Sequence, residues 1–164
     1  MRAARADLDR LWAPWRSVYV TQPMASRCIF CAAKRSRQNA PVYVVHRARR
    51  TFALLNRFPY NAGHLMVSSY RHVGALARLT SAERAELWDL TLQMTERLGR
   101  LLRPDGFNVG LNLGRAAGAG IAGHVHLHVV PRWIGDTNFM PVLGRTKVVS
   151  ASLDELYRQL IRLS

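Results

Sequence analysis

Several short, mostly apolar segments of the chain predict β-strands. These segments are Val42 to His46, Thr51 to Asn56, Gly63 to Ser69, Phe107 to Leu113 and Gly123 to Pro131. In the last segment, His124, His126 and His128 are separated by single apolar residues. Such alternation is typical of a strand with one face in a core, so we expect all three imidazoles on one face, roughly 6.5–7 Å apart from one to the next.

Helical periodicity occurs between the third and fourth of these segments and again near the end of the chain. Thr80 and Glu83 have the types and spacing of a capping box, which predicts that a helix begins there. Apolar residues then recur at helical spacing up to Pro104, namely Leu87, Leu90, Met94, Leu98, Leu101 and Leu102. A second amphipathic helix is expected from Ser152 to Leu163. The predicted fold is α+β, an antiparallel sheet of about five strands with one long helix and a C-terminal helix.

Length and composition limit the class of protein. With 164 residues, 49% of them hydrophobic, we expect one globular domain over residues 1–164. Residues 1–25 are expected to form an N-terminal arm, and residues 114–123 a glycine-rich loop before the histidine strand. No apolar run approaches membrane-spanning length, and the basic N-terminus lacks the apolar stretch of a signal peptide. These observations predict a cytoplasmic protein without a membrane partner.

The formal net charge of +14 predicts attraction to polyanions that weakens with salt. The basic residues are mostly arginine and are spread along the chain without a dense run. A polyphosphate substrate and a nucleic acid would both benefit from this field. The charge alone therefore does not distinguish between these two partners.

Two cysteines, Cys28 and Cys31, form the motif Cys-Ile-Phe-Cys. In a reducing compartment this pair indicates either a redox motif or half of a metal site, and no βαβ pattern surrounds it to favour the redox reading. Tetrahedral structural zinc needs two further ligands, which His72 and one histidine of the triad could supply. A catalytic zinc held by all three strand histidines is the alternative, but alternate imidazoles on one strand are widely spaced for sharing an ion.

The glycine-rich loop contains a string that matches the dinucleotide-binding pattern G-x-G-x-x-G, from Gly118 to Gly123. That pattern requires a strand before it and a helix after it. Here it runs into the histidine strand, so we exclude a nicotinamide or flavin site. Gly118 and Gly120 could instead let backbone amides approach a phosphate closely, although a plain flexible connection would have the same composition.

The central histidine of the triad, His126, is the best candidate for a nucleophile. A histidine nucleophile needs one free ring nitrogen, an acceptor that holds the other nitrogen, and donors for the developing charge. Phosphorus is the natural electrophile, because a phosphohistidine-type intermediate divides one displacement into two easier ones. A serine nucleophile is not favoured, since the chain has no Gly-x-Ser-x-Gly elbow.

These residues resemble the histidine triad (HIT) family of nucleotide hydrolases and transferases, whose pattern is His-φ-His-φ-His-φ-φ. The resemblance extends roughly from Leu11 to Val148. Further matching segments are Phe52 to Arg57, Gly63 to Val67, Pro131 to Trp133 and Gly135 to Phe139. The opening Leu-Trp-Ala-Pro-Trp-Arg and the Cys-Ile-Phe-Cys motif are similar to the bacterial branch related to dinucleoside polyphosphate hydrolases and phosphorylases.

The resemblance implies a separate role for each residue of the site. His126 is implied as the nucleophile that takes up a nucleoside monophosphoryl group. His128 would contact the bridging or leaving phosphate oxygens, and His64 would support the triad. Asn56 falls where the family holds the ribose hydroxyls, and Asn112 where a polar amide faces the phosphates.

The resemblance also implies a metal, a substrate and an assembly. In zinc-bearing members the metal ligands correspond to Cys28, Cys31, His72 and His124. Adenine nucleotides or dinucleoside polyphosphates are the implied substrates, and a magnesium ion could enter with the nucleotide. Family members are usually homodimers, with the long helix and the central strand near the interface.

One position divides the family by reaction. Some phosphorylases and nucleotidyltransferases carry glutamine at the third triad position, where this chain has His128. We therefore expect hydrolysis, while the Leu-Trp-Ala-Pro-Trp-Arg branch keeps phosphorolysis as the first alternative. A nucleic-acid-binding or regulatory protein with an inactive site is a second, less favoured alternative, because the triad is intact. A structural zinc module is a third.

Overall fold

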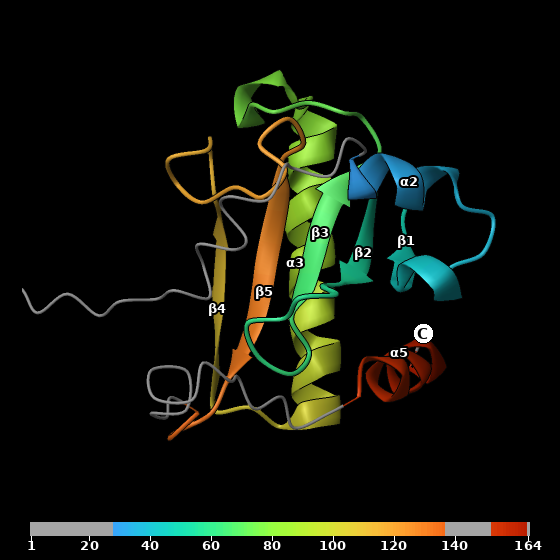
Figure 1. The fold of residues 1–164 in the computed structure, drawn as a ribbon, viewed down its shortest axis with the longest axis vertical. Helices are drawn as coiled ribbons and strands as arrows, with labels where there is room; N and C mark the ends of the chain where they lie inside the picture. Colours follow the sequence, from blue (N-terminus) through green and yellow to red (C-terminus); the bar gives the residue numbers. More distant parts are fainter. Residues whose placement is uncertain (1–27, 137–151, 164) are drawn as a thin grey trace, which may run out of the picture. The chain divides into compact units, whose positions relative to one another are not determined.

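The five strands predicted from the sequence form one antiparallel sheet in the computed structural model (Figure 1). They are β1 (Val44–Arg47), β2 (Thr51–Leu55), β3 (Leu65–Ser69), β4 (Gly106–Leu111) and β5 (His126–Arg132). Their order is β1-β2-β3-β5-β4, so β5 lies between β3 and the edge strand β4. The structure describes residues 28–136 and 152–163, which belong to one compact unit, and the expected arm over residues 1–25 lies outside them.

Alternate side chains of the strands enter two separate apolar cores, because successive residues of a strand point to opposite faces. On one face, α3 (Ser81–Leu102) and α5 (Leu153–Arg162) pack against residues such as Ala53, Val67 and Leu127. On the other face, α2 (Ile29–Arg35) packs against Phe52, Leu54 and Met66. Figure 1 shows α2 in front of the sheet and the long α3 behind it. The predicted α+β class is confirmed.

Several element boundaries differ from the sequence prediction, and α2 was not predicted at all. The first strand begins at Val44 rather than Val42, because a 3-10 turn over Ala40–Val42 precedes it and Tyr43 has a left-handed φ of 53°. The histidine strand begins at His126. Its predecessor His124 belongs to a turn, in which its N–H donates to the carbonyl of Ile121 at 3.1 Å.

The long helix begins at the predicted capping box. The Thr80 hydroxyl accepts a hydrogen bond from the Glu83 N–H, and the Glu83 carboxylate accepts one from the Thr80 N–H at 2.7 Å. The same carboxylate binds the Arg71 guanidinium at 2.7 and 2.8 Å. The helix ends at Leu102, where Arg103 adopts a left-handed φ of 47° before Pro104. Glu83 thus joins the start of α3 to the segment that follows β3.

The described residues contain no helix that is both long enough and apolar enough to cross a membrane.

Replacing Glu83 by Ala is expected to lower the free energy of unfolding by about 1–2 kcal/mol at pH 7, because the capping box is lost. The Arg71 guanidinium, helped by Thr80 and opposed by burial, lowers the pKa of Glu83 from 4.5 to about 2. A lowered carboxyl pKa stabilises the fold above the unfolded pKa, and this contribution disappears as the pH falls through the folded pKa. The difference between wild type and variant therefore shrinks between about pH 5 and pH 2.

Urea unfolding of both proteins at several pH values measures this difference. Glu96→Ala, on an exposed position of the same helix, is the control and is expected to change the free energy of unfolding by less than about 0.5 kcal/mol. Equal effects of the two substitutions would contradict the role assigned to the Glu83 cap.

Candidate active site

The three histidines lie on the face of the sheet that α2 covers. The Phe30 ring of α2 lies 5.0 Å from the His124 ring and 4.7 Å from the His126 ring, measured between centroids. The rings of His126 and His128 are 4.8 Å apart in an edge-to-face arrangement. This separation is shorter than the two-residue repeat of a strand, roughly 6.5–7 Å, because the side chains lean toward each other. The alternating pattern therefore predicted the common face but not the convergence of the rings.

The environment of His126 fixes which ring nitrogen carries the proton. Its Nδ1 lies 2.8 Å from the carbonyl oxygen of His124. A carbonyl oxygen only accepts, so Nδ1 carries the proton and donates it, and the lone pair remains on Nε2. Burial lowers the pKa of His126, although the bond to the His124 carbonyl opposes this effect. The side chain thus presents a neutral imidazole with an unprotonated Nε2, which is the form required of a nucleophile.

A second chain of hydrogen bonds fixes His64 and His128. The Tyr60 N–H donates to His64 Nδ1 at 3.0 Å, so the proton of His64 lies on Nε2. That nitrogen is 2.9 Å from His128 Nδ1 and donates to it. The remaining proton of His128 is therefore on Nε2, a buried atom with no hydrogen-bond partner among the described residues. Burial, followed by the repulsion that a protonated His126 would exert, lowers the pKa of His128 to about 4. His128 is thus a neutral hydrogen-bond donor at neutral pH.

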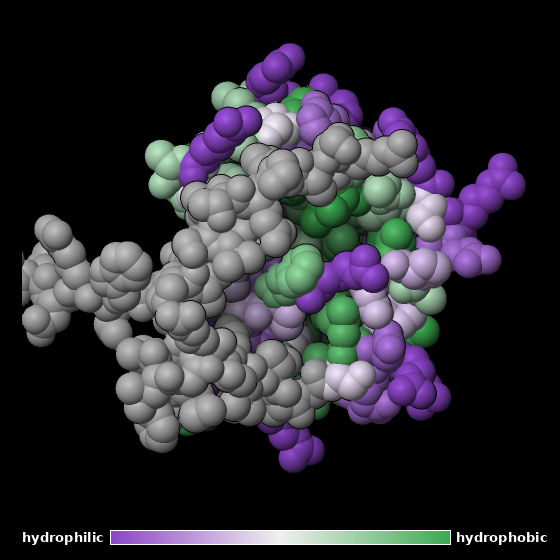
Figure 2. Space-filling model, in the orientation of Figure 1, coloured by the Kyte–Doolittle hydropathy of each residue, from purple (hydrophilic) through white to green (hydrophobic). Residues whose placement is uncertain are grey.

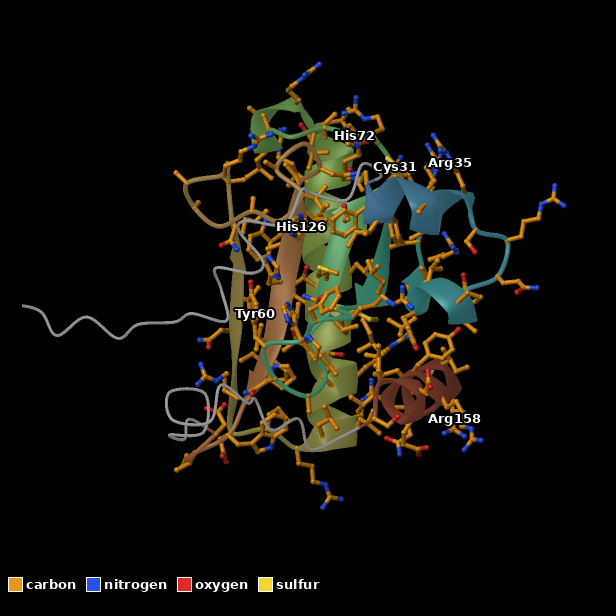
Figure 3. The ribbon with its side chains drawn as sticks, viewed as in Figure 1. Cys31, Arg35, Tyr60, His72, His126 and Arg158 are labelled. Atoms are coloured by element: carbon orange, nitrogen blue, oxygen red, sulfur yellow. The ribbon has the colours of Figure 1, made fainter. Side chains whose placement is uncertain are left out.

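Asn56 and Tyr60 shape the loop beside this pair. The Asn56 Oδ1 accepts from the Phe58 N–H at 3.0 Å, and its Nδ2 lies 3.4 Å from His64 Nδ1. The Tyr60 ring lies 4.5 Å from the His64 ring and is stacked on the His128 ring at 5.8 Å. Figure 3 shows Tyr60 and His126 on the face of the sheet that carries the site. Asn56 therefore stabilises the turn that carries Tyr60, a residue that the sequence did not single out.

The structure also places the other candidates for nucleotide contacts. Gly110 pairs with His128 across β4 and β5, so continuation of this register brings Asn112 level with His126. Gly118 lies in the loop before β5 with a left-handed φ of 84°, and its N–H donates to the Arg115 carbonyl at 2.9 Å. The Gly118 N–H is therefore already occupied by a hydrogen bond within the loop. Contacts of Asn112, Gly118 and Gly120 to a nucleotide remain predictions.

Four side chains from three distant segments converge at the other end of the triad. They are Cys28, Cys31, His72 and His124, whose ligand atoms all lie within 4.8 Å of one another. The Cys28 Sγ is 3.2 Å from His124 Nδ1, and the Cys31 Sγ is 3.3 Å from His72 Nδ1 and 3.9 Å from His124 Nδ1. Figure 3 shows Cys31 and His72 close together at this end of the sheet. In the described ranges, this is the group whose donors could hold a metal ion.

The geometry of this cluster fits zinc. Tetrahedral zinc with ligands at 2.0–2.3 Å places neighbouring ligand atoms about 3.3–3.8 Å apart. Three pairs in the cluster, at 3.2, 3.3 and 3.9 Å, are close to this range, and the remaining pairs lie within 4.8 Å. The Nε2 of His124 donates to the Ser69 carbonyl at 2.9 Å, so its Nδ1 directs a lone pair toward the cysteines. At Gly123, a Cβ atom would lie 3.1 Å from His72 Nε2, so glycine leaves room for that ring.

The site face of the sheet also differs in charge from the opposite face. No aspartate or glutamate occurs between Asp9 and Glu83, a stretch that includes α2 and strands β1 to β3. The acidic residues of α3 belong to the opposite face, against which that helix packs. Figure 2 shows hydrophilic side chains that project beside the segment between α2 and β1. Two arginines of this stretch pair with glutamates of α3, Arg50 with Glu86 and Arg71 with Glu83, so the excess positive charge of the stretch rests on its other basic residues.

Comparison with known proteins agrees with this geometry. The sequence model of the HIT domain matches residues 37–133. A relative in Mycobacterium tuberculosis, named AP-4-A phosphorylase, is 41% identical over 164 residues, which cover 95% of this chain and 84% of the relative. A bis(5'-adenosyl)-triphosphatase of Dictyostelium discoideum is 32% identical over 82 residues, 50% of this chain and 54% of that protein.

One similar solved structure shares the fold of this chain and contains bound zinc. A zinc-bound histidine triad family protein from Mycobacterium smegmatis superimposes with a TM-score of 0.67 at 25% identity, covering 82% of this chain and 91% of that protein. The family match includes His64, His72 and the whole triad. The resemblance inferred from the sequence is therefore confirmed, and the chain belongs to the histidine triad family.

Proposed function

We propose that this enzyme transfers a nucleoside monophosphoryl group from a dinucleoside polyphosphate to a second acceptor through a covalent intermediate on His126. Diadenosine polyphosphates are the first substrates to test. The observation that carries the proposal is the fixed tautomer of His126, whose Nδ1 donates to a backbone carbonyl at 2.8 Å while Nε2 keeps its lone pair. The relative named AP-4-A phosphorylase supports the substrate class.

In the first step, His126 Nε2 attacks the α-phosphorus and forms the N–P bond. The bond from phosphorus to the bridging oxygen breaks, and its electron pair leaves with the nucleoside polyphosphate. The His128 Nε2–H donates a hydrogen bond to the oxygen that acquires charge, but it need not transfer its proton, because a nucleoside polyphosphate is stable as an anion. His64 holds His128 in this role through the bond at 2.9 Å.

In the second step, an oxygen of the acceptor attacks phosphorus, and the N–P electron pair returns to His126 Nε2. Orthophosphate is the acceptor favoured by the 41% identical relative, whose name describes a phosphorylase. With orthophosphate the product is a nucleoside diphosphate. Water, the acceptor expected from His128 in the sequence, is the second candidate, and the Dictyostelium triphosphatase supports it. With water the product is a nucleoside monophosphate, and the proton that the water loses is released to solvent.

Nucleotide contacts beyond the reacting atoms complete the proposal. Asn56 would hold the ribose hydroxyls, and Asn112 would face the phosphates from its position level with His126. Gly118 and Gly120 would line the approach of the phosphate chain. Binding of this kind would open the Asn56 turn, since its Oδ1 now accepts from the Phe58 N–H.

Zinc is the metal that the cluster of Cys28, Cys31, His72 and His124 would hold, supported by the converging donors and by the zinc-bound relative. Its chemistry there is structural, because four protein ligands fill a tetrahedral zinc ion. Magnesium that enters with the nucleotide stays an untested prediction, since such an ion needs no protein ligands of its own. Thiol ligands fit a reducing compartment, so a cytoplasmic location remains part of the proposal.

A second copy of the chain would complete the sheet edge at β4. Val109 pairs with the buried Val129 but is itself 42% exposed. On α3, Trp88 and Leu92 are 48% and 62% exposed. Among the described residues β4 pairs with β5 alone, so its outer edge and the exposed Val109 suit a homodimer that joins two sheets.

Replacing His126 by Ala is expected to reduce turnover of diadenosine tetraphosphate by about 10⁴-fold or more, because the nucleophile is lost. Labelling of the protein by substrate that carries radioactive α-phosphate is expected to disappear as well. His46→Ala, a histidine substitution on β1 outside the site, is the matched control. Turnover or labelling of the His126 variant at the wild-type level would exclude the proposed intermediate.

Product analysis identifies the acceptor. With radiolabelled orthophosphate and diadenosine tetraphosphate, we expect labelled ADP and unlabelled ATP, and no turnover when phosphate is omitted. Formation of AMP and ATP at the same rate without phosphate would show that water is the acceptor. Chromatography of the nucleotides distinguishes these results.

Replacing Val109 by Lys is expected to convert a dimer into a monomer, because a buried charge would face its symmetric copy. Analytical ultracentrifugation of wild type and variant measures the change. Ile134→Lys, at a position that is 92% exposed after β5, is the control and is expected to leave the mass unchanged. A monomeric wild type would refute the proposed assembly.

A further inference from the structure

Phe30 connects the cysteine motif to the nucleophile. It lies between Cys28 and Cys31 in the sequence and is fully buried, with 0% of its surface exposed. Its ring contacts His124 at 5.0 Å and His126 at 4.7 Å between centroids. The residue that touches His126 is therefore carried by the same short helix that contains Cys31 and is capped by Cys28.

A second connection runs through the backbone of His124. The Nδ1 of this residue faces Cys28 at 3.2 Å, and its Nε2 donates to the Ser69 carbonyl at 2.9 Å. Its carbonyl oxygen accepts the Nδ1–H of His126 at 2.8 Å. His124 thus directs its Nδ1 toward the cysteines of the candidate metal site and its carbonyl oxygen toward His126. Movement of His124 would change the bond that fixes the tautomer of His126.

From these two connections we infer that the metal centre positions the nucleophile, with Phe30 and the His124 carbonyl as the links. Phe30 is a positioning residue, because it touches His126 and none of the reacting phosphate atoms. The expected effect on catalysis rests on the proposed function. The expected effect on the orientation of the His126 ring does not.

Close packing explains why the link is effective. The His126 ring is 5% exposed, and Phe30 closes one side of it at van der Waals contact. A buried ring held on one side by an aromatic side chain and at Nδ1 by a carbonyl has one orientation available. The helix that carries Phe30 is only seven residues long. Helices of this length are marginal without tertiary support, so the bound metal would hold α2, and through it Phe30, in place.

The first experiment observes His126 directly, without substrate. Protein labelled with ¹⁵N-histidine is compared with zinc bound and after removal of zinc by a chelator, and two-bond ¹H–¹⁵N correlations report the tautomer of each ring. We expect His126 to show a single Nδ1–H tautomer with zinc, and a mixture of tautomers or exchange broadening without it. His46 on β1 is expected to keep its signals. An unchanged His126 spectrum in zinc-free, folded protein would overturn the inference.

The second experiment retains the metal and removes the link. In Phe30→Leu, zinc content is expected to remain at about one ion per chain, whereas the single-turnover rate of His126 labelling falls about 10- to 100-fold with little change in KM. Phe52→Leu removes the same ring from the same apolar cluster and is the control, with an expected rate within about twofold of wild type. An equal loss in both variants would assign Phe30 a general packing role and overturn the inference.

The two experiments also separate this inference from the proposed function. If none of the dinucleoside polyphosphates labels the wild-type protein, the proposed function fails. The zinc-dependent tautomer of His126 still decides whether the metal positions the ring. If zinc removal unfolds the protein, Phe30→Leu with zinc bound gives the decision, because its His126 spectrum is expected to show the same mixture of tautomers. A single Nδ1–H tautomer in that variant would refute the link.

Discussion

The hydrogen bond from His126 Nδ1 to the carbonyl oxygen of His124 is the interaction on which the site depends. It decides the tautomer of the proposed nucleophile without an acidic residue, so the ring stays neutral and close to anionic phosphates without a repelling carboxylate. It requires His124 to leave the strand in a turn, since a regular ladder would give this carbonyl to a neighbouring strand. Because β5 begins only at His126, the His124 carbonyl is free to accept the hydrogen bond from the His126 ring.

Backbone groups fix the other histidines in the same way. The Tyr60 N–H sets the proton of His64, which then sets that of His128, and the Ser69 carbonyl sets that of His124. Backbone groups thus orient His64, His124 and His126 directly, and they orient His128 through the buried His64 side chain. Three histidines with the same chemistry thus present different groups: His124 Nδ1 a lone pair toward the cysteines, His126 Nε2 a lone pair, and His128 Nε2 a proton.

The sequence predicted those features that depend on local pattern. Alternation placed the histidines on one face, the Thr80 and Glu83 spacing located the start of α3, and the Cys-x-x-Cys motif with His72 suggested a metal cluster. It did not predict α2, whose seven residues are too short for a periodic signal. Nor could it predict tautomers or the contacts of Phe30 and Tyr60, because these depend on which backbone groups and rings meet across the fold. The only feature of the sequence that pointed to a role for Phe30 was its position between two potential metal ligands.

Charge and burial act at different distances in this molecule, and the site needs both. The arginine-rich, acid-free segment from α2 to β3 carries positive charge, whose field extends into solvent and would attract polyanions. Burial acts only on the rings themselves, and it lowers the pKa of His126 and of His128. If the nearby positive charge came from the histidines instead, His126 would lose its lone pair and could not attack phosphorus. The arginines can attract anions while these two rings stay neutral, because burial rather than a neighbouring guanidinium lowers the pKa of His126 and of His128.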